Sequence, residues 1–162
     1  MQDRYLFKAK RLDNGEWVIG NLIRNSDAED GWEAIIIPVK NSNMFTKHIG
    51  HGYGSLGFEN WYRVDPTTIC QCTGLKDKNG NLIWENDIVS CKHEKYIGTD
   101  VLDSKMHKYT RNYAIEFENT FCNYGLRFRN KSIHFRCKQA TLCMHDCEVL
   151  GNVFDNPELL EE

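Results

Sequence analysis

Residues 72–91 read CTGLKDKNGNLIWENDIVSC and hold two turn signals separated by a short apolar run. The residues at 77–80, Asp-Lys-Asn-Gly, fit a type I turn whose glycine takes the left-handed conformation and joins two strands through a bulge. Ile83 and Trp84 follow on opposite faces of the next strand, and one of the two is expected in the core. Asn86 then marks a second tight turn, because asparagine tolerates a positive φ. This stretch therefore predicts a β-hairpin.

The same stretch contains a small acid cluster, formed by Glu85 and Asp87. Paired carboxylates can act as general acid and base in catalysis. At a turn between strands, however, acidic side chains are typically solvated or cap the backbone. We therefore interpret these acids as part of the turn and expect this segment to specify a fold, not a catalytic site.

Short apolar runs separated by turn signals continue on both sides of this stretch. Asp13-Asn14-Gly15 predicts an N-terminal hairpin in which Trp17 and Ile19 face inward. Residues 41–57 and 92–112 are polar or glycine-rich and are expected to be irregular. No long amphipathic helix is indicated, and only a single helical turn is predicted after Asn156. The pattern is typical of an all-β barrel or sandwich.

Composition limits the class of protein. The chain has 162 residues, of which 41% are hydrophobic and 27% charged, so global disorder is not expected. The net charge of −3 gives no argument for nucleic-acid binding by the chain as a whole. No apolar run is long enough to cross a membrane. Seven cysteines without an export signal predict a reducing, cytoplasmic setting in which the thiols stay free.

Two groups of cysteine and histidine raise the question of a metal site. Cys70 and Cys72 form a C-x-C pair, and Cys143, His145 and Cys147 alternate in CMHDC. Structural zinc sites generally use pairs with C-x-x-C spacing, which neither group has. In strands, cysteines of the same parity are neighbours on one face and behave as small core residues. No metal is therefore expected.

Phosphate binding and nucleophilic catalysis are the other candidates for chemistry. Gly52, Gly54 and Gly57 satisfy G-x-G-x-x-G, but no helix follows whose N-terminus could hold a phosphate. The sequence contains neither a G-x-S-x-G elbow nor an H-E-x-x-H motif. We therefore expect no cofactor, no catalytic residue and no enzymatic activity.

Residues 126–138, LRFRNKSIHFRCK, predict a basic hairpin without an acidic residue. Apolar residues alternate on both sides of a turn near residues 130–132, which would place basic side chains together on the outer face. Such a face suits a phosphate backbone or an acidic protein, although a solvated sheet face has the same pattern. The candidate binding residues are Arg127, Arg129, Lys131, His134, Arg136 and Lys138.

Three segments resemble the YopX family of phage and prophage proteins: GEWVIGNLI at 15–23, residues 62–89 from YRVDP to NDIV, and VLGNVFDNPELL at 149–160. The resemblance implies a β-rich fold with a barrel of the SH3 type. We expect this barrel, with the C-terminal strand and a short helical turn, in residues 67–162 and a β-rich part in residues 1–66; the alternative is one intertwined domain. The resemblance also implies a gene carried on a phage or mobile element. It does not imply a reaction or catalytic residues.

The sequence departs from the family pattern at Cys72, where an aromatic residue is usual, and at Asn86, where glycine is usual. Both changes are compatible with the fold. We expect an accessory interaction module that binds another protein of the host or the phage. The alternative is a nucleic-acid-binding factor that uses residues 126–138, and a metal-dependent enzyme ranks third. No membrane partner is expected, and the oligomeric state stays open.

Overall fold

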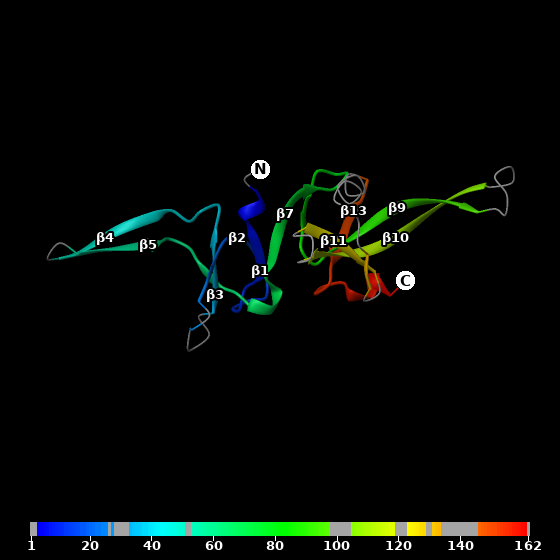
Figure 1. Cartoon of the computed structure of the whole chain (residues 1–162). Coiled ribbons are helices and arrows are strands. Elements are labelled where there is room, and N and C mark those ends of the chain that lie inside the picture. Colours follow the sequence, from blue (N-terminus) through cyan, green and yellow to red (C-terminus); the bar gives the residue numbers. More distant parts are fainter. Residues whose placement is uncertain are drawn as a thin grey trace. The chain divides into compact units, whose positions relative to one another are not determined.

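The computed structural model describes residues 3–25, 27, 33–50, 53–97, 105–118, 123–128, 131–133 and 146–161. Within these residues the structure consists of β-strands and short 3-10 helices, with no α-helix (Figure 1). The predicted all-β class is therefore confirmed. The chain divides into two compact units, Met1–Cys72 and Thr73–Glu162. The division predicted from the sequence, between residues 66 and 67, stays a prediction.

The first unit is built on an antiparallel sheet with the strand order β6-β3-β2-β1-β7, and β4 and β5 form a separate two-stranded sheet. Its elements are η1 (Asp3–Tyr5), β1 (Phe7–Lys10), β2 (Trp17–Arg24), β3 (Ala34–Pro38), β4 (Met44–Gly50), β5 (Tyr53–Phe58), β6 (Tyr62–Arg63), η2 (Pro66–Thr68) and the start of β7 (Cys70–Lys76). The segment predicted as irregular at 41–57 thus contains a hairpin.

One face of this sheet forms the core of the first unit. The buried residues are Ala9, Val18, Ala34, Ile36 and Val64. The expected inward orientation of Trp17 and Ile19 is wrong, because Ala9 lies opposite Val18 in the register and these two residues face the core. Successive strand residues alternate between faces, so Ile19 lies on the opposite face with 45% of its surface exposed.

Gly20 is a position where the strands approach too closely for a side chain. It lies between Phe7 of β1 and Pro38 of β3. A Cβ atom at this position would stand 2.0 Å from the backbone oxygen of Ile37 and 2.6 Å from its carbonyl carbon. Since these are backbone atoms, β2 and β3 would have to separate to make room.

We therefore expect Gly20→Ala to lower the free energy of unfolding by about 3 kcal/mol, as overpacking does in a tight site. Urea denaturation followed by far-ultraviolet circular dichroism measures the change. Gly54→Ala is the matched control, since its Cβ would lie 3.8 Å from the backbone oxygen of Lys47, an ordinary contact. Equal stability of the two variants would contradict the close approach.

The second unit contains an antiparallel sheet with the strand order β12-β11-β10-β9-β13, and β8 is hydrogen-bonded beside β7. Its elements are β8 (Leu82–Trp84), β9 (Asp87–Ile97), β10 (Lys105–Glu118), β11 (Asn123–Phe128), β12 (Lys131–Ile133), β13 (Glu148–Asn152) and η3 (Pro157–Leu160). The sheets are not closed into a barrel in the described part of the chain, so the SH3-like barrel is not confirmed.

The stretch at 72–91 adopts the predicted turns. Gly80 has a φ of 85° and Asn86 a φ of 65°, the positive values that the two turns require. Ile83 is fully buried and Trp84 is 6% exposed, so both residues enter the interior. The Asp87 carboxylate accepts a hydrogen bond from the backbone N–H of Trp84 at 2.8 Å. This acid therefore caps the turn, as the sequence predicts.

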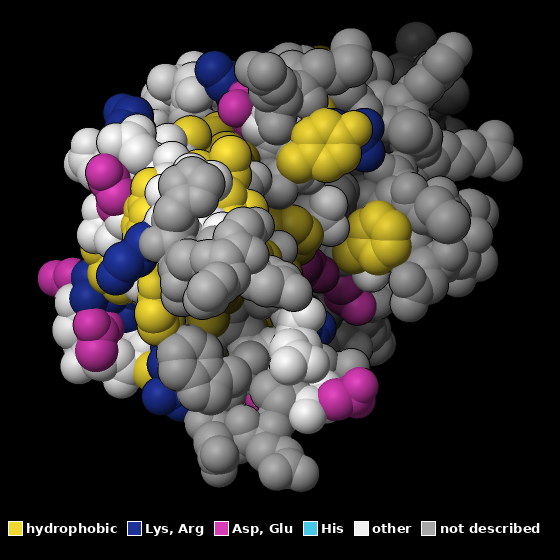
Figure 2. Space-filling view, turned by 90° about the vertical axis from the view of Figure 1, so that its left-hand side faces the viewer, with side chains coloured by type: hydrophobic (Ala, Val, Ile, Leu, Met, Phe, Trp, Pro, Cys, Tyr) yellow, Lys and Arg dark blue, Asp and Glu magenta, His cyan; other side chains and the backbone are white. Residues whose placement is uncertain are grey.

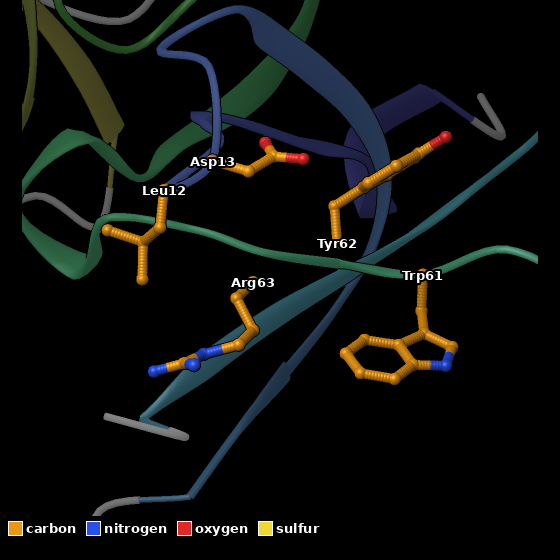
Figure 3. A pocket seen from close by; sticks show the side chains of 5 residues that line it. All are labelled: Leu12, Asp13, Trp61, Tyr62 and Arg63. Carbon is orange, nitrogen blue, oxygen red and sulfur yellow. The ribbon is translucent and has the colours of Figure 1, made fainter. Parts of the chain in front are cut away.

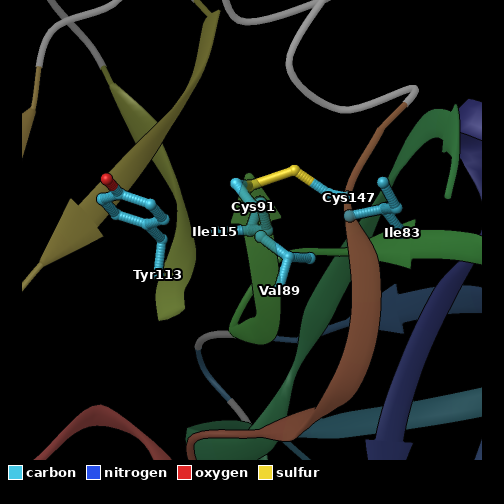
Figure 4. Packing of buried hydrophobic residues seen from close by; sticks show 6 residues of the cluster. All are labelled: Ile83, Val89, Cys91, Tyr113, Ile115 and Cys147. Atoms are coloured by element: carbon cyan, nitrogen blue, oxygen red, sulfur yellow. A yellow bond between two sulfur atoms is a disulfide. The ribbon is translucent and has the colours of Figure 1, made fainter. Parts of the chain in front are cut away.

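The core of the second unit surrounds a disulfide (Figure 4). It consists of Ile83, Val89, Cys91, Tyr113, Ile115 and Cys147, with Leu75 and Val149 packed against it. Cys91 on β9 and Cys147, which directly precedes β13, are joined with their Cα atoms 4.5 Å apart. The expectation that all thiols stay free is wrong for this pair, because the β9–β13 register places the two residues side by side. Cys70 and Cys72 remain buried thiols.

The polar segment at 92–112 was expected to be a loop, but its described residues continue β9 and β10. The two strands pair antiparallel from Ala114 opposite Ile88 to Lys105 opposite Ile97. The ladder pairs the backbone N–H and C=O groups, while most of the described side chains at 92–94 and 106–113 are exposed or half-buried. We call the part of this ribbon formed by residues 92–97 and 105–113 the β9–β10 arm.

Candidate interaction surfaces

The basic segment that the sequence singles out is only partly described. β11 and β12 form a hairpin in which Leu126 lies opposite Ile133 and Phe128 opposite Lys131. Arg127 is paired with Ser132 on one side and with Ala114 of β10 on the other. Four of the six candidate residues lie outside the described residues: Arg129, His134, Arg136 and Lys138. Binding by this segment stays a prediction.

The sheet of the first unit carries apolar side chains on the face opposite its core. Ile19 and Ile23 on β2 are 45% and 46% exposed. The register places Ile35 beside Ile23, and Arg63 beside Ile35. On the other side, Lys8 pairs with Ile19 and Lys10 with Trp17. We call this surface the outer face, defined by Lys8, Lys10, Trp17, Ile19, Ile23, Ile35 and Arg63. Ile37 has the same parity on β3 but is buried, with 6% of its surface exposed.

The outer face combines apolar groups with positive charge. The Lys8 and Lys10 ammonium groups lie 5.1 and 5.6 Å from the ring centroid of Trp17, which is the range of cation–π interactions. None of the described strand positions that define this face is acidic. Figure 2 shows exposed hydrophobic side chains with both basic and acidic side chains around them. An apolar surface of this kind with one sign of charge is typical of a binding surface.

A pocket of about 330 Å³ is lined by Leu12, Asp13, Trp61, Tyr62 and Arg63. Figure 3 shows the side chains of Trp61 and Arg63 extending to one side of the chain and that of Tyr62 to the other. This agrees with the register, in which Arg63 is paired with Ile35 of the outer face and Tyr62 with Ile36 of the core. The pocket therefore shares Arg63 with the outer face.

The charges at the pocket have structural partners. The Arg11 Nε donates a hydrogen bond to Asp13 Oδ1 at 2.8 Å, and the guanidinium lies 3.9 Å from the ring centroid of Tyr62. The hydrogen bond from Arg11 lowers the pKa of Asp13, so this carboxylate is held charged. The lining residues include no histidine or cysteine. The pocket is thus an aromatic and cationic recess in which the Asp13 carboxylate is already engaged by Arg11.

The β9–β10 arm carries a row of rings on one face. His93 and Tyr109, which are opposite each other in the register, stack with centroids 5.2 Å apart and planes inclined by 21°. His107 continues the row at 6.5 Å from Tyr109. The hydroxyl of Tyr113 and Nε2 of His93 share a hydrogen bond of 2.8 Å. The row therefore begins at the buried Tyr113 and ends at the exposed His107.

The arm is also cationic. Lys92, Lys108 and Arg111 are exposed, and the only acid among its residues is Glu94, which pairs with Lys108 at 3.1 Å. The Arg111 guanidinium lies 5.5 Å from the ring centroid of Tyr109. Burial and the nearby charge of Arg111 both lower the pKa of His93, which favours its neutral form. The ring row and the cations thus share one exposed ribbon.

Metal and phosphate chemistry find no support in the described residues. They contain no group of three or more histidine, cysteine or acidic residues that could hold a metal ion. Cys143 and His145 lie outside them, and Cys147 is in the disulfide. Gly54 and Gly57 lie in β5, which is followed directly by another strand, β6, and Gly52 is outside the described residues. No described helix has the length and hydropathy needed to cross a membrane.

A family model described as YopX protein matches residues 6–161. The chain belongs to the YopX family. The resemblance noted in the sequence is therefore confirmed over nearly the whole chain. A comparison with curated proteins finds no match.

One solved structure, that of protein EF1440 from Enterococcus faecalis, is similar to this YopX chain. The match covers 95% of this chain and 96% of the other, with a TM-score of 0.51 and 23% sequence identity. At this identity the similarity shows a shared fold alone, and binding residues cannot be transferred from it.

Sequence reasoning missed both the outer face and the arm of this YopX chain. The outer face was missed because Trp17 and Ile19 were assigned to the core. The arm was missed because its residues, from KHEK to HKYTRN, have few apolar side chains. The signal that could have found the arm is the same-parity spacing of His107, Tyr109, Arg111 and Tyr113, which places the four side chains on one face of a strand.

Proposed function

We propose that this YopX-family chain is a non-enzymatic interaction module that binds another protein through the outer face of its first unit. The observation that supports this most directly is the exposure of Ile19 and Ile23 beside lysine and arginine side chains. Burial of apolar surface stabilises a complex by about 25 cal/mol for each Å², so a partner that covers these two side chains is bound more tightly.

The partner that fits is an acidic protein segment with apolar side chains. Lys8 and Lys10 lie on one side of the apolar residues and Arg63 on the other. These positive charges attract an acidic partner and disfavour a basic one. The adjacent pocket offers Trp61 and Leu12 as apolar walls for an anchoring side chain. The phage or prophage setting implied by the family is part of this proposal, with a phage or host protein as the partner.

Site-specific photo-crosslinking in the cells that naturally express the chain tests the proposal. A photoreactive residue at position 23 should yield one discrete cross-linked protein. The same residue at position 150, where Leu150 is 44% exposed in the second unit, is the control and should not yield it. The cross-linked partner, identified by mass spectrometry, should contain an acidic segment with apolar residues.

Charge reversal on the outer face should change the yield of the same cross-link. Lys8→Glu combined with Arg63→Glu should reduce the cross-link at position 23 about tenfold or more, since like charges then oppose the partner. Lys40→Glu is the matched control, because Lys40 is exposed in the first unit but lies outside the outer face. Equal cross-linking in both variants, or equal yield from positions 23 and 150, would count against the outer face.

A further inference from the structure

We propose that the β9–β10 arm is a second binding site and that it binds single-stranded nucleic acid, with the ring row stacking on bases and the flanking cations contacting phosphates. The inference goes beyond the proposed function, because it concerns other residues, the other unit and another class of ligand. It rests on the combination of a ring row, exposed at His107 and half-buried at Tyr109 and His93, with exposed cations on one ribbon.

The ring row supplies faces for stacking. His93, Tyr109 and His107 follow one another along one face of the arm with nearly parallel planes. His107 is exposed at the far end of the row, and Tyr109 and His93 are half-buried. Bases of a single strand stack on aromatic side chains of this type without sequence preference, since every base has a π-face. Because His93 and Tyr109 already stack on each other, an unpaired base extends the row at its exposed end, beside His107.

The position of the ring row is fixed by the core at its base. Tyr113 is buried in the core of the second unit and shares its hydroxyl with Nε2 of His93 at 2.8 Å. The rings of Tyr113 and His93 also pack edge to face, with centroids 5.4 Å apart. His93 is therefore oriented before a ligand arrives, which lowers the entropy lost on binding.

Phosphate contacts come from exposed cations beside the ring row. Arg111 lies over the ring of Tyr109, where its planar guanidinium can receive a phosphate with two parallel hydrogen bonds. Thr110 lies opposite Lys92, and Lys108 lies opposite Glu94, on the other face of the ribbon. A backbone that passes along the edge of the arm would therefore meet positive charge on both faces.

A structural role for the ring row is the alternative explanation. Cross-strand aromatic pairs stabilise a two-stranded ribbon by themselves, by about 0.2–1 kcal/mol for each pair. That role explains the stacking of His93 on Tyr109 but not the exposed cations at Lys92 and Arg111. A two-stranded ribbon also fits the major groove of a duplex, where the rings would have no unpaired base to stack on. A test must therefore separate ring-dependent from ring-independent binding.

The test uses the full chain and fluorescence anisotropy with labelled oligo(dT) and oligo(U) of about 16 nucleotides, a duplex of equal length and polyglutamate. Tyr109→Leu should weaken single-strand binding about tenfold, the loss typical of one stacked base. Tyr109→Phe keeps the ring and should bind like the natural chain. Tyr5→Leu, at a residue that is 77% exposed in the first unit, is the matched control and should change nothing.

The salt dependence gives an independent measurement. Arg111→Gln should reduce the slope of log K against log salt by about 0.7, the value for one lost phosphate contact on a single strand. Lys47→Gln, on β4 of the first unit, is its control. Circular dichroism of each variant checks that it stays folded. If Tyr109→Leu does not fold, His107→Ala, at an exposed residue, replaces it and should also weaken single-strand binding, by a smaller factor.

Three results would overturn the inference. The first is no binding of either single strand at low salt. The second is equal binding of single strand and duplex with no loss in Tyr109→Leu, which would mean attraction to any polyanion. The third is polyglutamate binding with the same affinity and the same Arg111→Gln loss, which would assign the arm to an acidic protein. None of these results bears on cross-linking at the outer face.

Discussion

Replacement of Asp77 with alanine is expected to lower the free energy of unfolding of the second unit by about 4 kcal/mol. The Asp77 side chain is 5% exposed and accepts four hydrogen bonds. Its Oδ1 accepts hydrogen bonds from the backbone N–H groups of Asn79 and Asn81 at 2.9 and 2.8 Å, which closes the first turn of the stretch at 72–91. Its Oδ2 receives the backbone N–H of Val149 at 3.2 Å and thereby ties that turn to β13.

The size of this effect follows from what alanine would leave behind. Each buried donor that loses its acceptor costs about 1–3 kcal/mol, and three backbone N–H groups depend on this carboxylate. Urea denaturation followed by tryptophan fluorescence reports the change through Trp84, which is 6% exposed. Asp13→Ala removes an exposed carboxylate of the first unit and should change stability little. Similar losses in both variants would contradict this role of Asp77.

The Asp77 carboxylate also makes stability depend on pH. Burial raises its pKa, but the N–H groups of Val149, Asn81 and Asn79 outweigh burial and hold the pKa below the ordinary 3.8. A pKa that is lower in the folded than in the unfolded chain stabilises the fold fully above pH 4 and loses that contribution as pH falls through the folded value. Asparagine at position 77 cannot ionise, so the difference in free energy of unfolding between Asp77→Asn and the natural chain should become smaller below about pH 4. A constant difference from pH 7 to pH 2 would contradict this assignment.

Turns of this fold could be predicted from the sequence because their determinants are local. Gly80 and Asn86 each adopt the positive φ that the neighbouring residues indicate. The strand between them is short, so the burial of Ile83 and Trp84 also follows from nearby residues. The acid at position 77 belongs to the same local pattern, although its contact with Val149 joins residues far apart in the chain.

The faces of the first sheet could not be predicted in the same way, because they depend on which strands become neighbours. Trp17 and Ile19 look like core residues, whereas the true partners of β2 in the core include Ala9 and Ala34. Small residues give a weak hydrophobic signal, yet they allow close packing of the strands. An assignment that shifts by one residue moves every side chain of a strand to the other face.

The β9–β10 arm was missed for a different reason. A two-stranded ribbon with few buried side chains shows little alternation of apolar and polar residues, which is the main signal of a strand. His93 and Tyr109 lie opposite each other because β9 and β10 keep the register that also pairs Cys91 with Arg111. The candidate site on this arm thus depends on pairing across a segment that the sequence does not mark as a strand.

Loss of the Cys91–Cys147 disulfide is expected to destabilise the second unit by about 4 kcal/mol. The bond joins residues 56 positions apart, and closing a loop of this length restricts the unfolded chain by about that amount. Both cysteines are buried in the core beside Val89 and Ile115, so Cys91→Ala with Cys147→Ala removes little volume. The variant therefore reports mainly on the crosslink.

Peptide mapping without reductant should first recover the linked Cys91 and Cys147 peptides. Urea denaturation should then show the natural chain losing stability when reductant is added, down to the level of the double alanine variant. The stability of the double alanine variant should not change when reductant is added. An unchanged natural chain in reductant, or alkylation of both cysteines without reductant, would show that the pair does not form the bond in solution. The comparison matters for the setting of the protein, because a reducing compartment keeps such pairs as thiols and removes this contribution to stability.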